Sequence, residues 1–202
     1  LRDLRLEAMI PVFEREQPII VSANTISQIQ AAVAFAVRHQ VRLIIFGGYD
    51  AVSCSALLKQ HDVAVIVGSV YRLPRRQDDD YDAPFTLPAR LHQAGIPFCI
   101  ASNGRFGASN VRNLPYHAAT AAAFGLPVEE AIKAITLSPA RILGMADRVG
   151  SIAVGRDATL IVSSGNPLET TSHVELAFIQ GRQVDLMNKH TRLWQKYRTK
   201  YQ

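Results

Sequence analysis

The stretch Thr136-Leu-Ser-Pro-Ala-Arg-Ile-Leu-Gly144, followed closely by Gly150-Ser-Ile-Ala-Val-Gly-Arg-Asp-Ala-Thr-Leu-Ile-Val162, marks a change of architecture within the chain. Before it, apolar residues recur at helical spacing, as over 128–136 and 139–143. After it, turn residues are mixed with β-forming residues. The sequence therefore predicts an α/β part that passes through helices into a small β module.

Upstream of this stretch, four short apolar runs predict four buried strands, and helical segments separate them. The runs span 18–21, 41–46, 63–67 and 96–101. The helical segments between them span 25–38, 50–59 and 87–93. Buried strands that alternate with helices indicate a parallel sheet with right-handed crossovers. Periodicity alone leaves open whether this sheet is doubly wound or a stretch of barrel.

Downstream, residues 174–184 predict a β-hairpin with Gly181 at its turn, because two β-rich runs flank Gln180-Gly181. Residues 188–201 predict a basic amphipathic helix. The change in residue composition and periodicity after the α/β part suggests that the chain has three segments. We place them at 1–148, 149–186 and 187–202.

The composition is that of a globular chain, with 202 residues, 48% of them hydrophobic, and a formal net charge of +5. The basic residues do not form one block, so we expect no nucleic-acid partner. No apolar run approaches the roughly 20 residues that span a bilayer, and we expect no membrane partner. Cys54 and Cys99 lie far apart on apolar segments, which is typical of reduced thiols. We therefore expect a cytoplasmic location.

The segments Glu129 to Gly144 and Asp147 to Val162 resemble the C-terminal end of the amidohydrolase superfamily, in particular its imidazolonepropionase-like and prolidase-like branch. In that branch a helix reads T-x-N-P-A-x-x-L-G, and a strand reads G-S-I-x-x-G-K-D-A-D-L-x-V. Ser138, Arg156 and Thr159 stand here for the usual Asn, Lys and Asp. The resemblance implies the C-terminal half of a TIM-like (β/α)8 barrel, strands five to eight, plus part of a small β-sandwich.

The same resemblance implies that a divalent metal, zinc or another, is held where the strands end. The positions of the family's fifth-strand and sixth-strand His residues are Ser22 and Gly47 or Gly48, and that of the eighth-strand Asp is Asn103. A neutral hydroxyl is a poor zinc ligand, and glycine has no side chain. The amide of Asn103, at the catalytic position, cannot accept a proton at neutral pH. We therefore expect this chain to hold no metal, whereas the family's His-x-His pair belongs to a strand outside it.

Other polar residues lie near the expected carboxyl ends of the strands. Three arginines at one rim would attract an anion, although surface arginines are often only solvated. Asn24 also suits a helix cap, and Asp78 to Asp80 suit a solvated loop. The residues that we expect to bind a small-molecule substrate are Ser22, Asn24, Tyr71, Arg72, Arg105 and Arg112.

Two functions remain open. The first is a hydrolase that cleaves C–N bonds other than ordinary peptide bonds, in a cyclic amide or a dipeptide-like substrate. The second is a non-catalytic pseudoenzyme of the same fold that acts in binding or assembly. An unrelated nucleotide-binding domain would need a Gly-rich phosphate loop, which residues 22–25 do not provide.

Four strands cannot close a barrel, and open sheet edges tend to pair. We therefore expect the chain to pair with the missing N-terminal half of the barrel or, as a homo-oligomer, with a second copy of itself.

Overall fold

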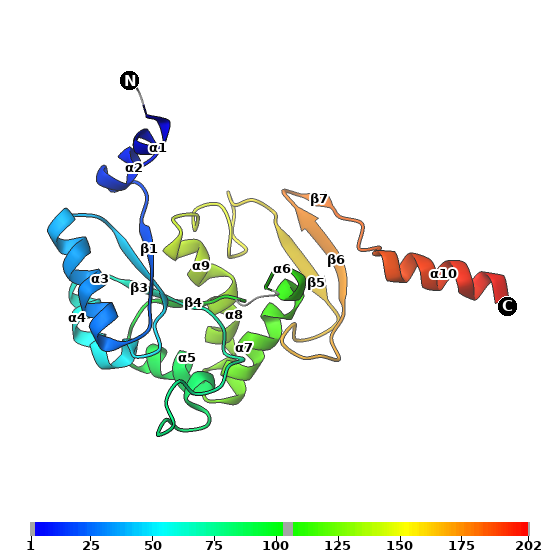
Figure 1. Cartoon of the computed structure of the whole chain (residues 1–202). Helices are drawn as coiled ribbons and strands as arrows, with labels where there is room; N and C mark the ends of the chain where they lie inside the picture. The colour runs from blue at the N-terminus through cyan, green and yellow to red at the C-terminus, as the bar shows by residue number, and fades with distance from the viewer. Residues whose placement is uncertain (1–2, 103–106, 202) are drawn as a thin grey trace. The chain divides into compact units, whose positions relative to one another are not determined.

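The computed structural model describes residues 3–102 and 107–201, and the chain divides into two compact units (Figure 1). The first unit spans Leu1–Ser151 and the second spans Ile152–Gln202. The first unit contains a parallel sheet with helices, and the second contains an antiparallel sheet and a terminal helix. The α/β architecture expected from the sequence is confirmed.

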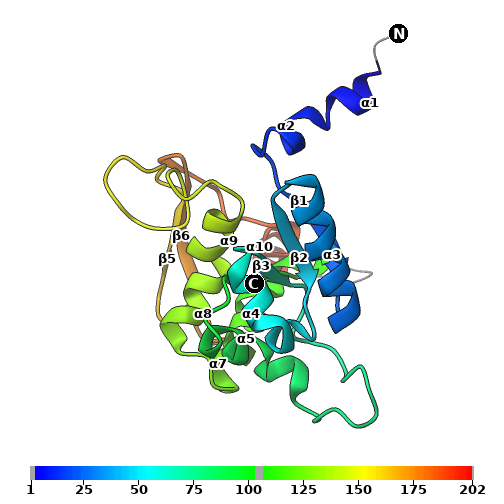
Figure 2. The same cartoon turned by 90° about the vertical axis from the view of Figure 1, so that its left-hand side faces the viewer.

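A four-stranded parallel sheet forms the centre of the first unit. Its strands follow chain order: β1 (Ile19–Ala23), β2 (Leu43–Gly47), β3 (Ala64–Val67) and β4 (Phe98–Ile100). The connections are α3 (Ile26–His39), the 3-10 turn η1 (Ala51–Cys54) with α4 (Ser55–Gln60), and α5 (Ala83–Gln93). β1 and β2 lie side by side (Figure 2), with Ala23 opposite Gly47. The predicted alternation of strands and helices is confirmed.

Local sequence signals set where the helices of this unit begin. Thr25 caps α3 in a capping box with Gln28, in which each side chain bonds the other residue's backbone N–H. α5 begins four residues earlier than predicted, because Pro84 suits the first turn of a helix. Two short helices, α1 (Leu4–Glu7) and α2 (Ile10–Phe13), precede β1.

Several helical segments follow β4. They are α6 (Gly107–Asn110), the 3-10 turn η2 (Val111–Asn113), α7 (Leu114–Ala123), α8 (Val128–Ile135) and α9 (Leu137–Ile142). Gly150 then packs against α9: a Cβ there would lie 2.8 Å from Cβ of Ala140 and 2.9 Å from the carbonyl oxygen of Thr136. Its φ of +94° is also one that residues with side chains rarely adopt. The signature stretch therefore requires glycine at this position.

Helices lie on both sides of the sheet, which explains the continuous apolar runs of β2 to β4, whereas one face of β1 is exposed, with Ile20 at 53%. Figure 1 shows α3 and α4 on one side of the sheet and α8 and α9 on the other. On the α9 side, Ile44, Ile66 and Cys99 pack with Ile142. Because successive side chains of a strand point to opposite faces, Ile45 and Val65 face α3 and α4.

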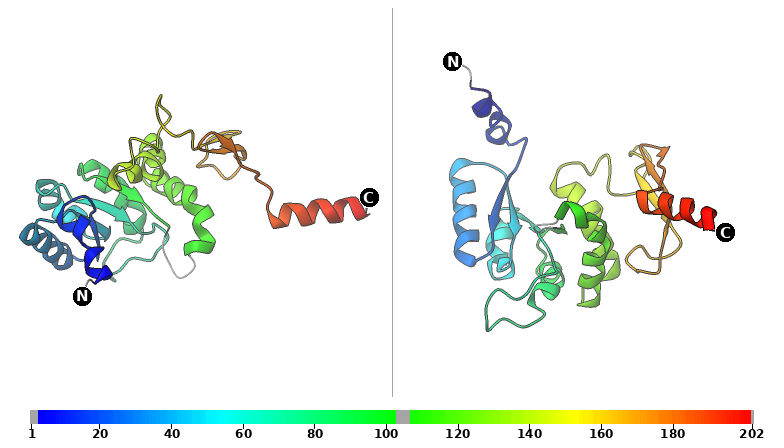
Figure 3. Two further views of the ribbon diagram at one scale, coloured as in Figure 1. Left: turned by 90° about the horizontal axis from the view of Figure 1, so that it is seen from above. Right: turned by 45° about the vertical axis from the view of Figure 1, so that its right-hand side comes forward.

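The second unit holds an antiparallel sheet, shown from two sides in yellow to orange in Figure 3. Its strands are β5 (Leu160–Ser163), β6 (Val174–Ile179) and β7 (Arg182–Gln183). Gln180 and Gly181 join β6 to β7 with φ values of +50° and +77°, as in the tight turns that suit hairpins. The predicted hairpin is therefore confirmed. α10 (Lys189–Tyr201) ends the described chain, and no helix of residues 3–102 and 107–201 is long and apolar enough to cross a membrane.

The burial of α3 leads to a stability prediction. Ile29 is fully buried, whereas Ile26, on the same helix, is 43% exposed. We expect Ile29→Ala to lower the free energy of unfolding by about 2–5 kcal/mol, through lost burial and a residual cavity. Ile26→Ala should cost less than about 1 kcal/mol. Urea unfolding followed by circular dichroism measures both, and equal losses would contradict the packing of α3.

Candidate functional site

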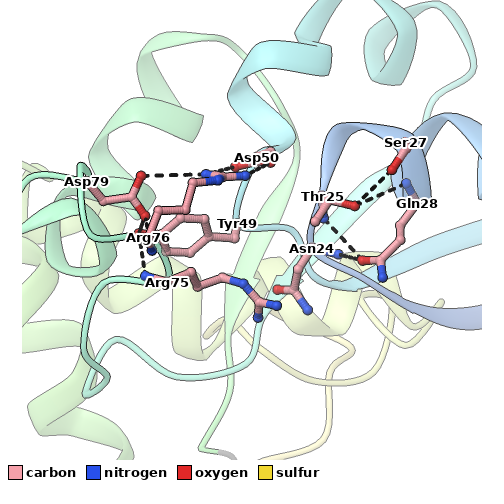
Figure 4. A network of polar contacts seen from close by, with 9 residues as sticks. All are labelled: Asn24, Thr25, Ser27, Gln28, Tyr49, Asp50, Arg75, Arg76 and Asp79. Atoms are coloured by element: carbon pink, nitrogen blue, oxygen red, sulfur yellow. Dashed lines mark hydrogen bonds and ion pairs between the residues drawn. The ribbon is translucent and has the colours of Figure 1, made fainter.

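The candidate site lies where the parallel strands of the first unit end. Asn24 follows β1 directly, Tyr49 and Asp50 follow β2, and the segment 68–82 follows β3. Backbone bonds join the first two strand ends, since N–H of Gly48 donates to the carbonyl of Ala23 and N–H of Asp50 donates to that of Asn24. Because parallel strands share the edge at which they end, these polar residues come together, as Figure 4 shows.

A network of charged hydrogen bonds holds the segment after β3 against the end of β2 (Figure 4). The Tyr49 hydroxyl donates to Asp79 Oδ2 at 2.7 Å, and the backbone N–H of Arg76 donates to the same oxygen at 2.9 Å. The Arg76 guanidinium binds both carboxylate oxygens of Asp50, with the Nη1–Oδ1 distance at 3.0 Å. Such bidentate pairs fix geometry as well as charge. The network therefore fixes residues 75–79 beside Tyr49.

The network shifts the pKa values of its members in directions that follow from its contacts. The hydrogen bond from Tyr49 holds the pKa of Asp79 below its ordinary value. Burial raises the pKa of Tyr49, and the bond to Asp79 raises it further. Hydrogen bonding to Asp50 raises the pKa of Arg76. The interpretation of residues 78–80 as a solvated loop is thus wrong for Asp79, because its side chain is only 16% exposed and is paired.

Two arginines of the same segment lack a carboxylate partner within the described part of the chain. Arg72 is partly buried, and burial together with the charge of Arg75 lowers its pKa. The Arg75 guanidinium lies 5.9 Å from the centre of the Tyr49 ring. Two neighbouring cations without a counter-ion favour an anionic ligand.

Asn24 contributes an amide to this region rather than a helix cap. The cap of α3 is Thr25, so the capping interpretation of Asn24 is wrong. The Asn24 Oδ1 atom is buried without a hydrogen-bond partner, and its amide lies over the backbone of Gly47. A buried polar atom without a partner is costly unless a ligand or water completes it. Because Oδ1 only accepts hydrogen bonds, the partner that it lacks at the end of β1 is a donor.

The described strand ends do not fit a divalent metal. A Cβ at Gly48 would lie 2.4 Å from Cγ1 of Val65, and one at Gly47 would lie 2.6 Å from Oδ1 of Asn24. Both contacts are with side chains, and the φ values of +104° and +64° disfavour any residue with a Cβ at the family's sixth-strand position. Ser22 is exposed on β1 and offers only a neutral hydroxyl. Across residues 3–102 and 107–201, no group of three His, Cys, Asp or Glu residues could hold a metal ion.

The structure distributes the predicted substrate-binding residues unevenly. Arg72 and Asn24 both lie near Tyr49 and Arg75, whereas Arg112 is exposed in η2. Asn103 and Arg105 lie outside the described residues. These placements concentrate the site on the ends of β1, β2 and β3.

Tyr71 connects the segment after β3 to α7 rather than facing Arg75. Its hydroxyl donates to the carbonyl of Tyr116 at 2.8 Å and accepts a bond from Thr120 at 3.0 Å. Its ring also lies 4.3 Å from that of His117, between centroids. His117 is 4% exposed, its Nδ1 has no hydrogen-bond partner, and burial lowers its pKa. Tyr71 therefore positions the segment that carries Arg72.

The residues that sequence reasoning missed are Tyr49, Arg76 and Asp79 as a unit, and His117 as a buried group. The adjacency of Arg75-Arg76 to the run of aspartates was a signal for local ion pairing. Nothing in the sequence indicated that the Tyr49 hydroxyl donates a hydrogen bond to the Asp79 carboxylate, because 30 residues separate the two.

Comparison with known proteins gives a family match over most of the chain. The family described as the amidohydrolase family matches residues 56–187. The imidazolonepropionase of Cupriavidus pinatubonensis is 29% identical over 161 residues, which are 79% of this chain and 36% of that protein. The imidazolonepropionase of Micrococcus luteus is 36% identical over 100 residues, 49% of this chain and 24% of that protein.

Solved structures of amidohydrolases and a prolidase also superpose on this chain. An amidohydrolase from Thermotoga maritima superposes with a TM-score of 0.82 at 28% identity, covering 92% of this chain and 48% of that one. A prolidase solved with N-methylphosphonate-L-proline superposes with a TM-score of 0.62 at 24% identity. The superposition covers 86% of this chain and 47% of the prolidase chain. The second likeness shows the fold alone. The chain thus spans about a third or less of the curated relatives named above and about half of these solved structures.

The tight strand end at Gly48 leads to a stability prediction. Gly48 and Gly95 have nearly equal φ values, +64° and +67°, but only at Gly48 would a Cβ meet another atom within 4 Å. We expect Gly95→Ala to cost about 1 kcal/mol through backbone strain. Gly48→Ala should cost about 1–3 kcal/mol more, through the clash with Val65. Denaturant unfolding measures the difference, and equal costs would show that the strand end can relax.

The buried His117 leads to a pH prediction. Its pKa lies below the ordinary 6.5, so the unfolded chain gains this proton at a higher pH than the folded one. Stability is therefore lost as the pH falls through the ordinary pKa toward the folded one. We expect His117→Asn to reduce the loss of unfolding free energy between neutral and mildly acidic pH. The exposed His61→Asn is the control, and the prediction fails if both variants follow the wild-type pH profile.

Proposed function

The chain belongs to the amidohydrolase family, and we propose that it forms the substrate-binding part of a hydrolase that cleaves C–N bonds other than ordinary peptide bonds. The family match and the imidazolonepropionase relatives support a C–N bond hydrolase. The substrate that we propose is a cyclic amide or a dipeptide-like molecule that carries a carboxylate. The observation that carries this proposal is the pair Arg72 and Arg75 at the strand ends.

The charge balance of the site supports a carboxylate-bearing substrate. Arg76 is already neutralised by Asp50 and Asp79, so it is not available to a ligand. Arg72 and Arg75 keep their charge close together, and the cost of burying Arg72 is offset when an anion binds. A guanidinium matches a carboxylate with two parallel hydrogen bonds.

The fold supports a place for this chain within a larger barrel. We propose that β1 to β4 are strands five to eight of a TIM-like barrel and that β5 to β7 are part of a β-sandwich. Within the described residues, β1 and β4 are the edges of the parallel sheet. The proposed partner is the other four strands, supplied by another part of the same protein or by a second copy. The buried thiols Cys54 and Cys99 support a cytoplasmic location.

A second candidate function is non-catalytic binding or assembly. The observation that favours it is the absence of metal-ligating side chains at Ser22, Gly47 and Gly48. In the hydrolase, the catalytic divalent metal would have to be held by residues beyond these strand ends. The two functions therefore differ in one measurable property, which is turnover that depends on a bound metal.

The test uses the complete protein, metal analysis and a screen of cyclic amides and dipeptide-like substrates with and without a carboxylate. We expect turnover of carboxylate-bearing substrates. Arg72→Gln should raise KM about tenfold or more, since a charged hydrogen bond contributes about 1.5–3 kcal/mol. Arg38→Gln, on the exposed surface of α3, is the matched control and should leave KM unchanged.

Two outcomes would count against this account. Absence of both turnover and bound metal would favour the non-catalytic function. Turnover without preference for a carboxylate, or without an effect of Arg72→Gln, would leave the hydrolase standing but contradict the proposed binding site.

A further inference from the structure

The last helix of the described chain has a charge unlike that of the rest. α10 reads Lys189-His-Thr-Arg-Leu-Trp-Gln-Lys-Tyr-Arg-Thr-Lys-Tyr201 and contains no Asp or Glu. Five of its residues are Lys or Arg, which equals the formal net charge of +5 for the whole chain. The helix therefore carries a local positive field that the rest of the chain does not share.

The apolar residues of α10 gather on one face. At 3.6 residues per turn, Leu193, Trp194 and Tyr197 fall within an arc of about 100°. All three are exposed, at 39%, 57% and 48%. The face opposite is polar, with Thr191, Gln195 and Thr199 together with Arg192, which pairs with Asp185.

Basic side chains border this apolar face on both sides. The Arg198 guanidinium lies 4.5 Å from the centre of the Trp194 ring, and Nζ of Lys196 lies 5.9 Å from that of Tyr197. Lys189 falls on the same border as Lys196 when the helix is projected along its axis. The aromatic rings thus sit between cations rather than beside polar neutral groups.

We propose that α10 binds the surface of an anionic lipid bilayer, lying in the headgroup region with Leu193, Trp194 and Tyr197 toward the acyl chains. Cations that flank an apolar face match anionic headgroups above a hydrocarbon layer. Trp and Tyr favour this interface, because each has an apolar body and a polar end. The earlier expectation of no membrane partner rested on the lack of a spanning segment, which a helix in the interface does not need.

The arrangement favours lipid over nucleic acid. A helix that binds a phosphate backbone places its basic residues at the centre of the contact face. In α10 the face holds Leu193, Trp194 and Tyr197 with His190 among them, and Lys196 and Arg198 lie at its borders. A lipid headgroup layer satisfies both features at once, whereas a duplex surface would leave Leu193 exposed to water.

Trp194 makes the test specific, because it is the chain's one tryptophan. The full chain is mixed with phosphatidylcholine vesicles with or without phosphatidylserine, and binding is followed by tryptophan emission and co-sedimentation. We expect a blue shift and at least about tenfold tighter binding with phosphatidylserine. Binding should weaken as salt rises from 0.1 to 1 M, since the Debye length falls from about 10 to about 3 Å.

Two pairs of variants separate charge from apolar contact. Lys189→Gln with Lys196→Gln should weaken binding about tenfold, whereas Lys59→Gln on α4 should not. Leu193→Ser should weaken binding and reduce the blue shift, whereas Thr191→Ser on the polar face should not. The proposal is overturned by an unshifted emission, by equal binding to vesicles without phosphatidylserine, or by tighter binding to a DNA duplex with the same dependence on the variants.

Discussion

The close approach of backbone at the ends of β1 and β2 is the constraint on which the rest of the site depends. Gly47 and Gly48 allow Asn24 and Val65 to pack against bare backbone, at distances that a Cβ would make impossible. This approach joins the two strand ends and leaves the Asn24 amide buried with an unpaired oxygen. A side chain at either glycine would meet Asn24 or Val65 and would need a strained backbone, since both φ values are positive.

The distribution of charge around that rim follows from pairing. Asp50 and Asp79 both bind Arg76, and Tyr49 completes the pairing of Asp79. Asp50 and Asp79 are thus both paired with Arg76, and no carboxylate partner of Arg72 or Arg75 is found within the described part of the chain. A fixed segment with two free guanidinium groups is suited to holding an anion in one orientation.

The sequence predicted the elements that depend on local patterns. Parallel strands and the hairpin at Gln180-Gly181 were predictable because apolar runs and turn residues act over a few positions. The Tyr49–Asp79 contact was not, because it joins residues that only the fold brings together. The sequence did not predict that α5 begins at Ala83, because Pro84, which suits the first turn of a helix, also indicates a loop. The absence of a side chain at Gly48 follows from the sequence, whereas its close approach to Val65 is visible only in the structure.

The central claim is that Arg72 and Arg75 bind an anionic group of the substrate at the strand ends. The most direct test is a crystal structure of the complete protein with a carboxylate-bearing cyclic amide. The account predicts that the carboxylate lies within hydrogen-bond distance of the Arg72 or Arg75 guanidinium, beside Asn24. A carboxylate held elsewhere, with both arginines facing solvent, would contradict it.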